Sequence, residues 1–116
     1  MDLSKRQIEI IEAATQLIGK GGVKSLTTKT LAAEMGFSEP ALYRHFADKN
    51  EILKSVLIYY KEKLKEGLTN VINSDLSGKE KIKGMIDFQF GHFTKYPAVI
   101  MVIFSETSFQ YNSQMS

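Results

Sequence analysis

A repeated helix-start signal restricts the fold of this chain more than any other feature. A residue that can cap a helix is followed three positions later by Gln or Glu, and this occurs at Ser4 with Gln7, Asp48 with Glu51, and Ser77 with Glu80. In such a capping box each of the two side chains accepts a hydrogen bond from the other residue's backbone N–H. Apolar residues spaced three or four apart follow each signal, and no segment alternates as a strand does. We therefore predict an all-helical fold.

Glycine and proline divide the apolar segments into six expected helices. Gly21 and Gly22 end the first helix, Gly36 ends the second, and Pro97 follows the fifth. Glycine can adopt the left-handed conformation that closes a helix, and proline cannot continue one. The expected helices cover about 5–19, 28–35, 39–46, 49–72, 78–96 and 98–107.

Composition excludes several kinds of chemistry. The 116 residues are 43% hydrophobic, which is enough for one ordinary core. No cysteine is present, so disulfides, thiolate metal sites and thiol nucleophiles are excluded. No apolar run approaches the roughly 18 residues of a membrane span, and the first ten residues lack the apolar stretch of a secretion signal. We expect a cytoplasmic protein with no membrane partner.

The stretch GFSEPALYRHF concentrates polar side chains on one short helix. Ser38 can cap this helix, and Pro40 fits its first turn, where a missing N–H forfeits no hydrogen bond. Because successive helical residues lie about 100° apart, Leu42 and Phe46 share one face while Pro40 and Arg44 share the opposite one. With the preceding short helix and the glycine turn between them, this is a helix-turn-helix arrangement.

The exposed face of that short helix is typical of a recognition helix that enters the DNA major groove. Arg44 can donate two hydrogen bonds to guanine, and Pro40 can touch a thymine methyl group. Glu39 can accept from cytosine, but a carboxylate in the first turn of a helix is favourable by itself, so both interpretations stay open. Tyr43 and His45 are better placed for the DNA backbone.

Total charge does not predict nucleic-acid binding, because the net charge is only +2. The position of the charges is more informative. Lys5, Arg6, Lys29 and Lys49 all fall in the first turn of an expected helix, where the helix dipole disfavours positive charge. An external anion such as a DNA phosphate would reverse that effect.

Residues 4–57 resemble the DNA-binding region of the tetracycline-repressor (TetR/AcrR) family of transcription regulators. The resemblance rests on the stretch IIEAATQLIGKGGVKSLTTKTLAAEMGFSEPALYRHFADKNEIL. It implies a helix-turn-helix DNA-binding domain over residues 1–48. A connecting helix and part of a helical ligand-binding and dimerisation domain would then occupy residues 49–116. It also implies base contacts from the recognition helix and phosphate contacts from Thr27, Tyr43, His45 and Lys49.

Geometry and resemblance together give one set of candidate DNA-contacting residues and no catalytic residue, metal ligand or cofactor. The candidates are Thr27, Thr28, Lys29, Ser38, Glu39, Pro40, Ala41, Tyr43, Arg44, His45 and Lys49. The resemblance further implies a homodimer on a roughly palindromic double-stranded operator, released by a small-molecule inducer of unknown identity. Family members are longer than this chain, and the two carboxy-terminal helices of their dimer interface have no counterpart here. We therefore expect this chain to be monomeric or weakly associated.

Two other functional classes compete with a transcriptional repressor. Catalysis is disfavoured because the only histidines, His45 and His92, fall on different expected helices, and no nucleophile motif is present. A nucleoid organiser or division inhibitor carrying the same DNA-binding region cannot be distinguished from a repressor by sequence. A cluster of apolar residues near the carboxyl end is interpreted as core rather than as a ligand pocket, and consists of Met85, Phe88, Phe90, Phe93, Tyr96, Met101 and Phe104.

Overall fold

The computed structural model describes residues 2–105 and is helical throughout, with no β-strand in that range. The elements are α1 (Lys5–Gly21), a 3₁₀ turn η1 (Val23–Ser25), α2 (Thr28–Met35), α3 (Glu39–Tyr43), α4 (Lys49–Ile72) and α5 (Gly78–Lys95). Residues 97–105 are also helical. The predicted all-helical class is confirmed, and residues 106 and 107 of the expected sixth helix lie outside the described residues.

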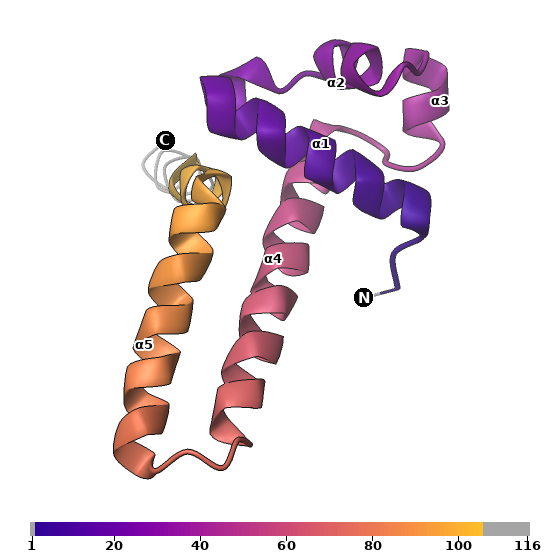
Figure 1. The fold of residues 1–116 in the computed structure, drawn as a ribbon. Helices are drawn as coiled ribbons and strands as arrows, with labels where there is room; N and C mark the ends of the chain where they lie inside the picture. The colour runs from indigo at the N-terminus through magenta and orange to yellow at the C-terminus, as the bar shows by residue number, and fades with distance from the viewer. Residues whose placement is uncertain (1, 106–116) are drawn as a thin grey trace, which may run out of the picture.

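Figure 1 shows two parts. Helices α1, α2 and α3 gather at one end to form a head, while α4 and α5 run antiparallel as a hairpin that projects away from it. The helical segment 97–105 returns to the head, where Met101 and Phe104 line a shallow hollow together with Gly22 and Val23. The carboxyl end of the hairpin therefore lies beside the end of α1.

One apolar cluster joins the head to the hairpin. Its members come from every helix except α5, and they are Ile10, Ile11, Ala14, Ile18, Leu26, Leu31, Ala32, Leu42, Phe46, Ile52, Leu53, Val56, Tyr60, Ala98, Val99 and Val102. The cluster contains residues from both sides of the predicted domain boundary after residue 48. The division into two domains at that position stays a prediction. In α1, Ile8 is only partly buried, whereas Ile10 is fully buried.

Three of the helix starts form as the sequence predicted, and one differs in detail. The boxes at Ser4 and Ser77 are complete, and Ser38 caps α3. At α4, Asp48 accepts from the Glu51 N–H at 2.9 Å, but the Glu51 carboxylate accepts from the Ala47 N–H at 3.1 Å and not from that of Asp48. The prediction of a complete box is therefore wrong here. The backbone of Asp48 is almost fully extended (φ −162°, ψ −179°). The Glu51 carboxylate therefore reaches the N–H of Ala47 and not that of Asp48.

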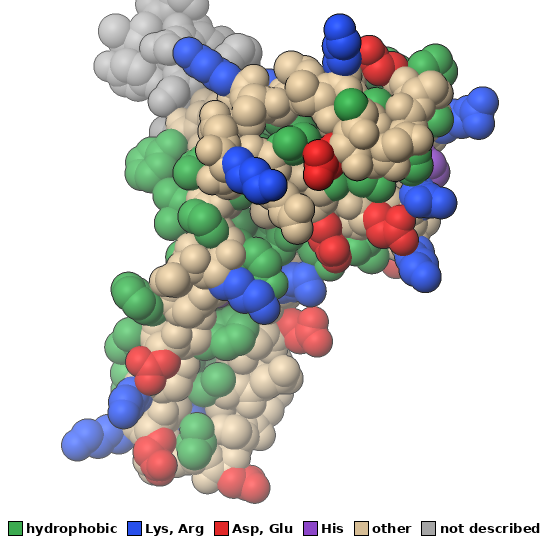
Figure 2. Space-filling view, turned by 45° about the horizontal axis from the view of Figure 1, so that its top comes forward, with side chains coloured by type: hydrophobic (Ala, Val, Ile, Leu, Met, Phe, Trp, Pro, Cys, Tyr) green, Lys and Arg blue, Asp and Glu red, His purple; other side chains and the backbone are tan. Residues whose placement is uncertain are grey.

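The core assignment of the carboxy-terminal aromatic residues is correct only in part. Phe88, Phe93 and Tyr96 are partly buried, whereas Phe90 is 76% exposed and Phe104 is 68% exposed, so the expectation is wrong for these two. Helix α5 packs on α4 along one face only, and Phe90 lies on the other. It shares that outer face with Ile82 and Ile86, and Figure 2 shows hydrophobic side chains along this edge of the hairpin.

Gly67, in the second half of α4, lets the two helices of the hairpin approach closely. A Cβ atom built on Gly67 would overlap the ring of Phe88 in α5. Gly91 of α5 also lies inside a helix, but a Cβ atom there would meet nothing within 4 Å. The two glycines thus differ in packing and not in the type of secondary structure they occupy.

Substitution by alanine should have opposite effects at these two positions. Gly91→Ala should raise the free energy of unfolding by about 0.5–1 kcal/mol, because alanine is the better helix former. Gly67→Ala should lower it by about 1–3 kcal/mol, because the Phe88 ring must be displaced. Guanidinium unfolding followed by circular dichroism measures both effects. Partial recovery in Gly67→Ala/Phe88→Leu is expected, and a stabilising Gly67→Ala would contradict this account of the packing.

His92 lies in an aromatic cluster near the carboxyl end of α5, on the side of the hairpin that joins the head. Its ring contacts Tyr96 with centroids 5.2 Å apart and Phe93 with centroids 5.4 Å apart, and only 7% of the residue is exposed. Burial lowers the pKa of the imidazole below its usual 6.5, and the charge of Lys63 lowers it further. The folded protein therefore resists protonation of this histidine more than the unfolded chain does.

This difference should make stability depend on pH. Because the folded-state pKa is depressed, the contribution of His92 is fully present above the unfolded pKa near 6.5 and is lost as pH falls below it. Unfolding midpoints in guanidinium at about pH 7.5 and about pH 5.5 should differ more in the native protein than in His92→Gln. His45 is retained in both proteins, so its effect cancels. An equal pH dependence in the two proteins would rule out His92 as the source.

Candidate nucleic-acid interface

The turn between α2 and α3 is set by one glycine. Gly36 adopts the left-handed conformation (φ 72°, ψ 26°), and the next N–H, of Phe37, donates to the Ala32 carbonyl at 2.8 Å. Thr27 caps the start of α2 and Thr30 completes a capping box with it. The search for capping boxes in the sequence did not find this one, because threonine replaces the usual Glu or Gln at the third position.

Helix α3 is held from behind by two apolar residues. Leu42 is 0% exposed and Phe46 is 2% exposed, so both are buried as predicted. The expected helix over 39–46 is shorter in the structure, because α3 ends at Tyr43 and Phe46 lies just beyond it. A polar tie reinforces this attachment, since Gln7 Nε2 at the start of α1 donates to the His45 carbonyl at 3.1 Å. The sequence gives no signal for this contact, because the two residues are 38 positions apart.

The opposite face of α3 is open to solvent. Pro40 and Arg44 are exposed, and Tyr43 is 46% exposed. Ala41 and His45 at the flanks are partly buried. The structure therefore presents the candidate base-reading side chains outward, and no part of the described chain covers them.

A short hydrogen-bond relay links this face to α2. The Tyr43 hydroxyl donates to Thr28 Oγ1 at 3.1 Å, and Thr28 Oγ1 donates to Glu39 Oε2 at 3.2 Å. Glu39 also lies in the first turn of α3, where a carboxylate is favoured. The position of the Glu39 carboxylate is therefore favourable without any DNA, through Thr28 and the start of α3. The other interpretation of the sequence, a contact to cytosine, stays a prediction.

The other candidates of the set differ in how free their polar groups are. Thr27 and Ser38 are exposed, but their hydroxyls accept from backbone amides as helix caps. Lys29 is exposed. Lys49 is partly buried, and its Nζ donates to the Val23 carbonyl at 3.1 Å. A lysine ammonium has three donors, so two of them stay available at the start of α4.

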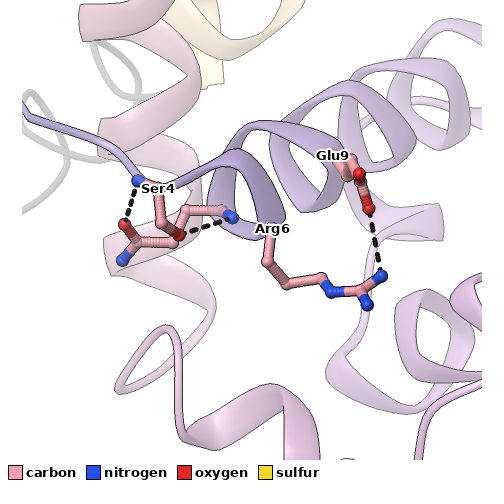
Figure 3. Close-up of polar contacts among 4 residues, drawn as sticks. Ser4, Arg6 and Glu9 are labelled. Atoms are coloured by element: carbon pink, nitrogen blue, oxygen red, sulfur yellow. Dashed lines mark hydrogen bonds and ion pairs between the residues drawn. The ribbon is translucent and has the colours of Figure 1, made fainter.

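Arg6 is fixed in place at the start of α1. Its guanidinium lies 5.2 Å from the centroid of the Phe37 ring and forms an ion pair with Glu9 at 3.0 Å. Figure 3 shows this pair next to the Ser4 capping box. Neither α1 nor α2 has an acidic residue in its first turn, whereas α4 has Glu51. In Figure 2, basic side chains stand out around the edge of the head with acidic ones between them.

No group of three or more His, Cys, Asp or Glu side chains within residues 2–105 is arranged to hold a metal ion. No helix in the same range is long and apolar enough to cross a bilayer.

The fold and the open face of α3 define a helix-turn-helix protein, and comparison with known proteins identifies the family. Residues 10–56 match the family model described as bacterial regulatory proteins, tetR family. The chain is 29% identical, over 97% of its length, to a protein of Bacillus subtilis named uncharacterized HTH-type transcriptional regulator YerO. It is 31% identical, over 69% of its length, to the nucleoid occlusion factor SlmA of Vibrio atlanticus.

Solved structures share the same fold. The ketosteroid transcriptional regulator KstR2 of Mycobacterium tuberculosis matches 97% of this chain and 57% of its own, with a TM-score of 0.75 and 23% identity. A TetR-like transcriptional regulator from Rhodococcus sp. RHA1 matches 99% of this chain and 64% of its own, with a TM-score of 0.75 and 19% identity. Residues 10–56 therefore carry the region that defines the tetR family, and most of the chain shares the fold of these regulators. It spans 40% of the length of the Bacillus protein and 41% of the Vibrio protein.

Proposed function

We propose that this chain is the DNA-binding part of a transcriptional regulator, acting as a ligand-responsive repressor on a palindromic operator. The observation that carries the proposal is the geometry of α3, whose apolar side is fixed in the core while Pro40, Tyr43 and Arg44 face solvent. A recognition helix needs this combination of a rigid attachment and an open polar face. The match to the tetR family model supports the same interpretation.

The proposal assigns two kinds of contact to the candidate residues. Arg44 and Pro40 read base edges, since they project from the face opposite the core. Tyr43, His45 and Lys29 contact phosphates, which position the protein without reading sequence. Lys49 adds a phosphate contact through the two donors not used by Val23. Thr27 adds a further phosphate contact, and the remaining candidate DNA contacts, Thr28, Ser38, Glu39 and Ala41, lie in or beside this surface.

Regulation in the proposed mechanism is positional. Two heads of a dimer must be about 34–36 Å apart to fill successive major grooves. The head and α4 share one apolar cluster, so a ligand that displaces α4 would carry the head with it. Dimerisation on the operator and release by a small-molecule ligand are parts of this proposed mechanism. It is further proposed to lie in the cytoplasm, on the nucleoid, and to have no enzymatic activity.

Selection of bound sequences from random duplex DNA tests the proposal. We expect enrichment of a defined motif. The affinity for it should fall steeply between about 50 and 200 mM salt, because binding releases counterions from the DNA and this release is less favourable at higher salt. Fluorescence anisotropy with the selected duplex and a scrambled duplex gives both values. Binding that shows neither a motif nor salt dependence would exclude a DNA-binding regulator.

Two variants separate the proposed roles. Arg44→Ala should weaken binding to the selected site by about 1–3 kcal/mol and relax preference at one base pair. Tyr43→Phe should weaken binding about equally for all sequences, because phosphate contacts carry no sequence information. Anisotropy against single-base operator variants distinguishes the two patterns.

Lys65→Ala is the matched control, since it removes one positive charge from an exposed site on α4 away from α3. Its affinity and sequence preference should stay close to those of the native chain. An unchanged selected motif in Arg44→Ala would remove this residue from the base-reading set. A changed motif in Tyr43→Phe would overturn its assignment to phosphate.

Several relatives favour a second candidate function. Proteins named nucleoid occlusion factor SlmA from several bacteria match 69–86% of this chain at 23–31% identity. A protein of that kind would use the same head on DNA without controlling transcription. Mapping of bound sites in cells distinguishes the two, since a repressor should occupy a few promoters and a nucleoid-associated factor many scattered positions.

A further inference from the structure

A cavity of about 420 Å³ lies between the head and the hairpin, away from the exposed face of α3. Three segments distant in the sequence form its walls. Glu12 comes from α1, Tyr59, Tyr60 and Lys63 come from α4, and Lys95 and Tyr96 come from the end of α5. Such a cavity is within the usual size range of small-molecule sites, and nothing in the proposed DNA contacts uses it.

Two lysines face this cavity without a carboxylate partner. Neither Lys63 nor Lys95 forms an ion pair with any described residue. Each ammonium group instead lies over an aromatic ring of the cavity wall. The Lys63 Nζ is 4.9 Å from the centroid of Tyr59, and the Lys95 Nζ is 5.4 Å from the centroid of Tyr96. Cation–π attraction of this kind holds the two ammonium groups at the cavity without neutralising them.

Charge distinguishes this cavity from the neighbouring hollow. The same two lysines also line a second hollow, where Glu66 and Asp87 supply two negative charges against the two positive ones. In the first cavity only Glu12 opposes them, which leaves two positive charges and one negative. Within this cavity the excess of one positive charge favours an anion.

The remaining wall is aromatic. The rings of Tyr59 and Tyr60 meet edge to face with centroids 5.0 Å apart, and the rings of Tyr60 and Tyr96 lie 4.5 Å apart. Burial raises the pKa of the Tyr60 hydroxyl above 10.0, so that group stays protonated at neutral pH. Flat ring faces beside phenolic hydroxyls suit an aromatic body better than an aliphatic one.

We propose that this cavity binds a small aromatic anion, with its carboxylate or phosphate group between Lys63 and Lys95 and its ring against the tyrosines. The site would not depend on the proposed DNA binding, because it needs neither DNA nor a second copy of the chain. Lysine ammonium groups donate charge-assisted hydrogen bonds to either kind of anionic group.

Titration of the full chain with four probes tests the site and its two chemical requirements. Benzoate and phenyl phosphate represent the two anionic groups, benzamide removes the charge, and inorganic phosphate removes the ring. Calorimetry together with amide chemical shifts should show saturable binding of at least one aromatic anion, with shifts centred on Tyr59, Tyr60 and Tyr96. Benzamide and inorganic phosphate should bind about tenfold more weakly or worse.

Charge-removing variants locate the anion. Lys63→Gln and Lys95→Gln should each weaken the bound aromatic anion by about tenfold. Lys65→Gln, which removes an exposed lysine of the same helix outside the cavity, should leave the affinity unchanged. Glu12→Gln should tighten binding, because it removes the one negative charge of the wall. Circular dichroism of each variant establishes that it is folded.

Several results would overturn the proposal. Absence of saturable binding of both aromatic anions at millimolar concentration would remove the site. Equal affinity for benzamide would remove the role of charge, and equal affinity for inorganic phosphate would remove the role of the ring. Equal weakening by Lys65→Gln and Lys63→Gln would show general surface attraction and no defined site.

Discussion

Burial of Leu42 and Phe46 is the interaction on which the presentation of α3 depends. Helix α3 has five residues, far fewer than an isolated helix needs for stability in water. Its position therefore comes from packing, and each fully buried side chain contributes about 1.5–3 kcal/mol. Because Leu42 and the nearby Phe46 both point into the core, the opposite face of α3 is directed to solvent. An anchored helix with an open polar surface is the physical basis of the proposed DNA contacts.

Polar ties determine the orientation of this helix more than its stability. Gln7 connects the carboxyl end of α3 to α1, and Thr28 connects Tyr43 and Glu39 to α2. Lys49 joins the start of α4 to the turn after α1. Such bonds contribute about 0.5–1.5 kcal/mol each, less than the burial of the apolar residues. These hydrogen bonds restrict the rotation of α3, which could tilt if only Leu42 and Phe46 held it.

Helix α4 carries this arrangement into the rest of the molecule. Its first half belongs to the same apolar cluster as α1 and α3, and its second half packs on α5 through the glycine opposite Phe88. The proposed anion cavity lies where α1, α4 and the end of α5 meet. Helices α1 and α4 thus have two roles: they form walls of the cavity, and they belong to the core that anchors α3. The outer face of α5, with Ile82, Ile86 and Phe90, is largely exposed.

The sequence by itself determined where helices start and end, and which side of α3 is apolar. Caps, glycine turns and helical spacing act over about four residues, so Ser38, Gly36 and Leu42 could be interpreted without the rest of the chain. The tertiary structure decided how polar and aromatic side chains are used. The partner of Lys49 lies 26 positions away, and the exposure of Phe90 depends on which face of α5 meets α4. No local pattern contains these contacts, because packing between distant helices brings the groups together.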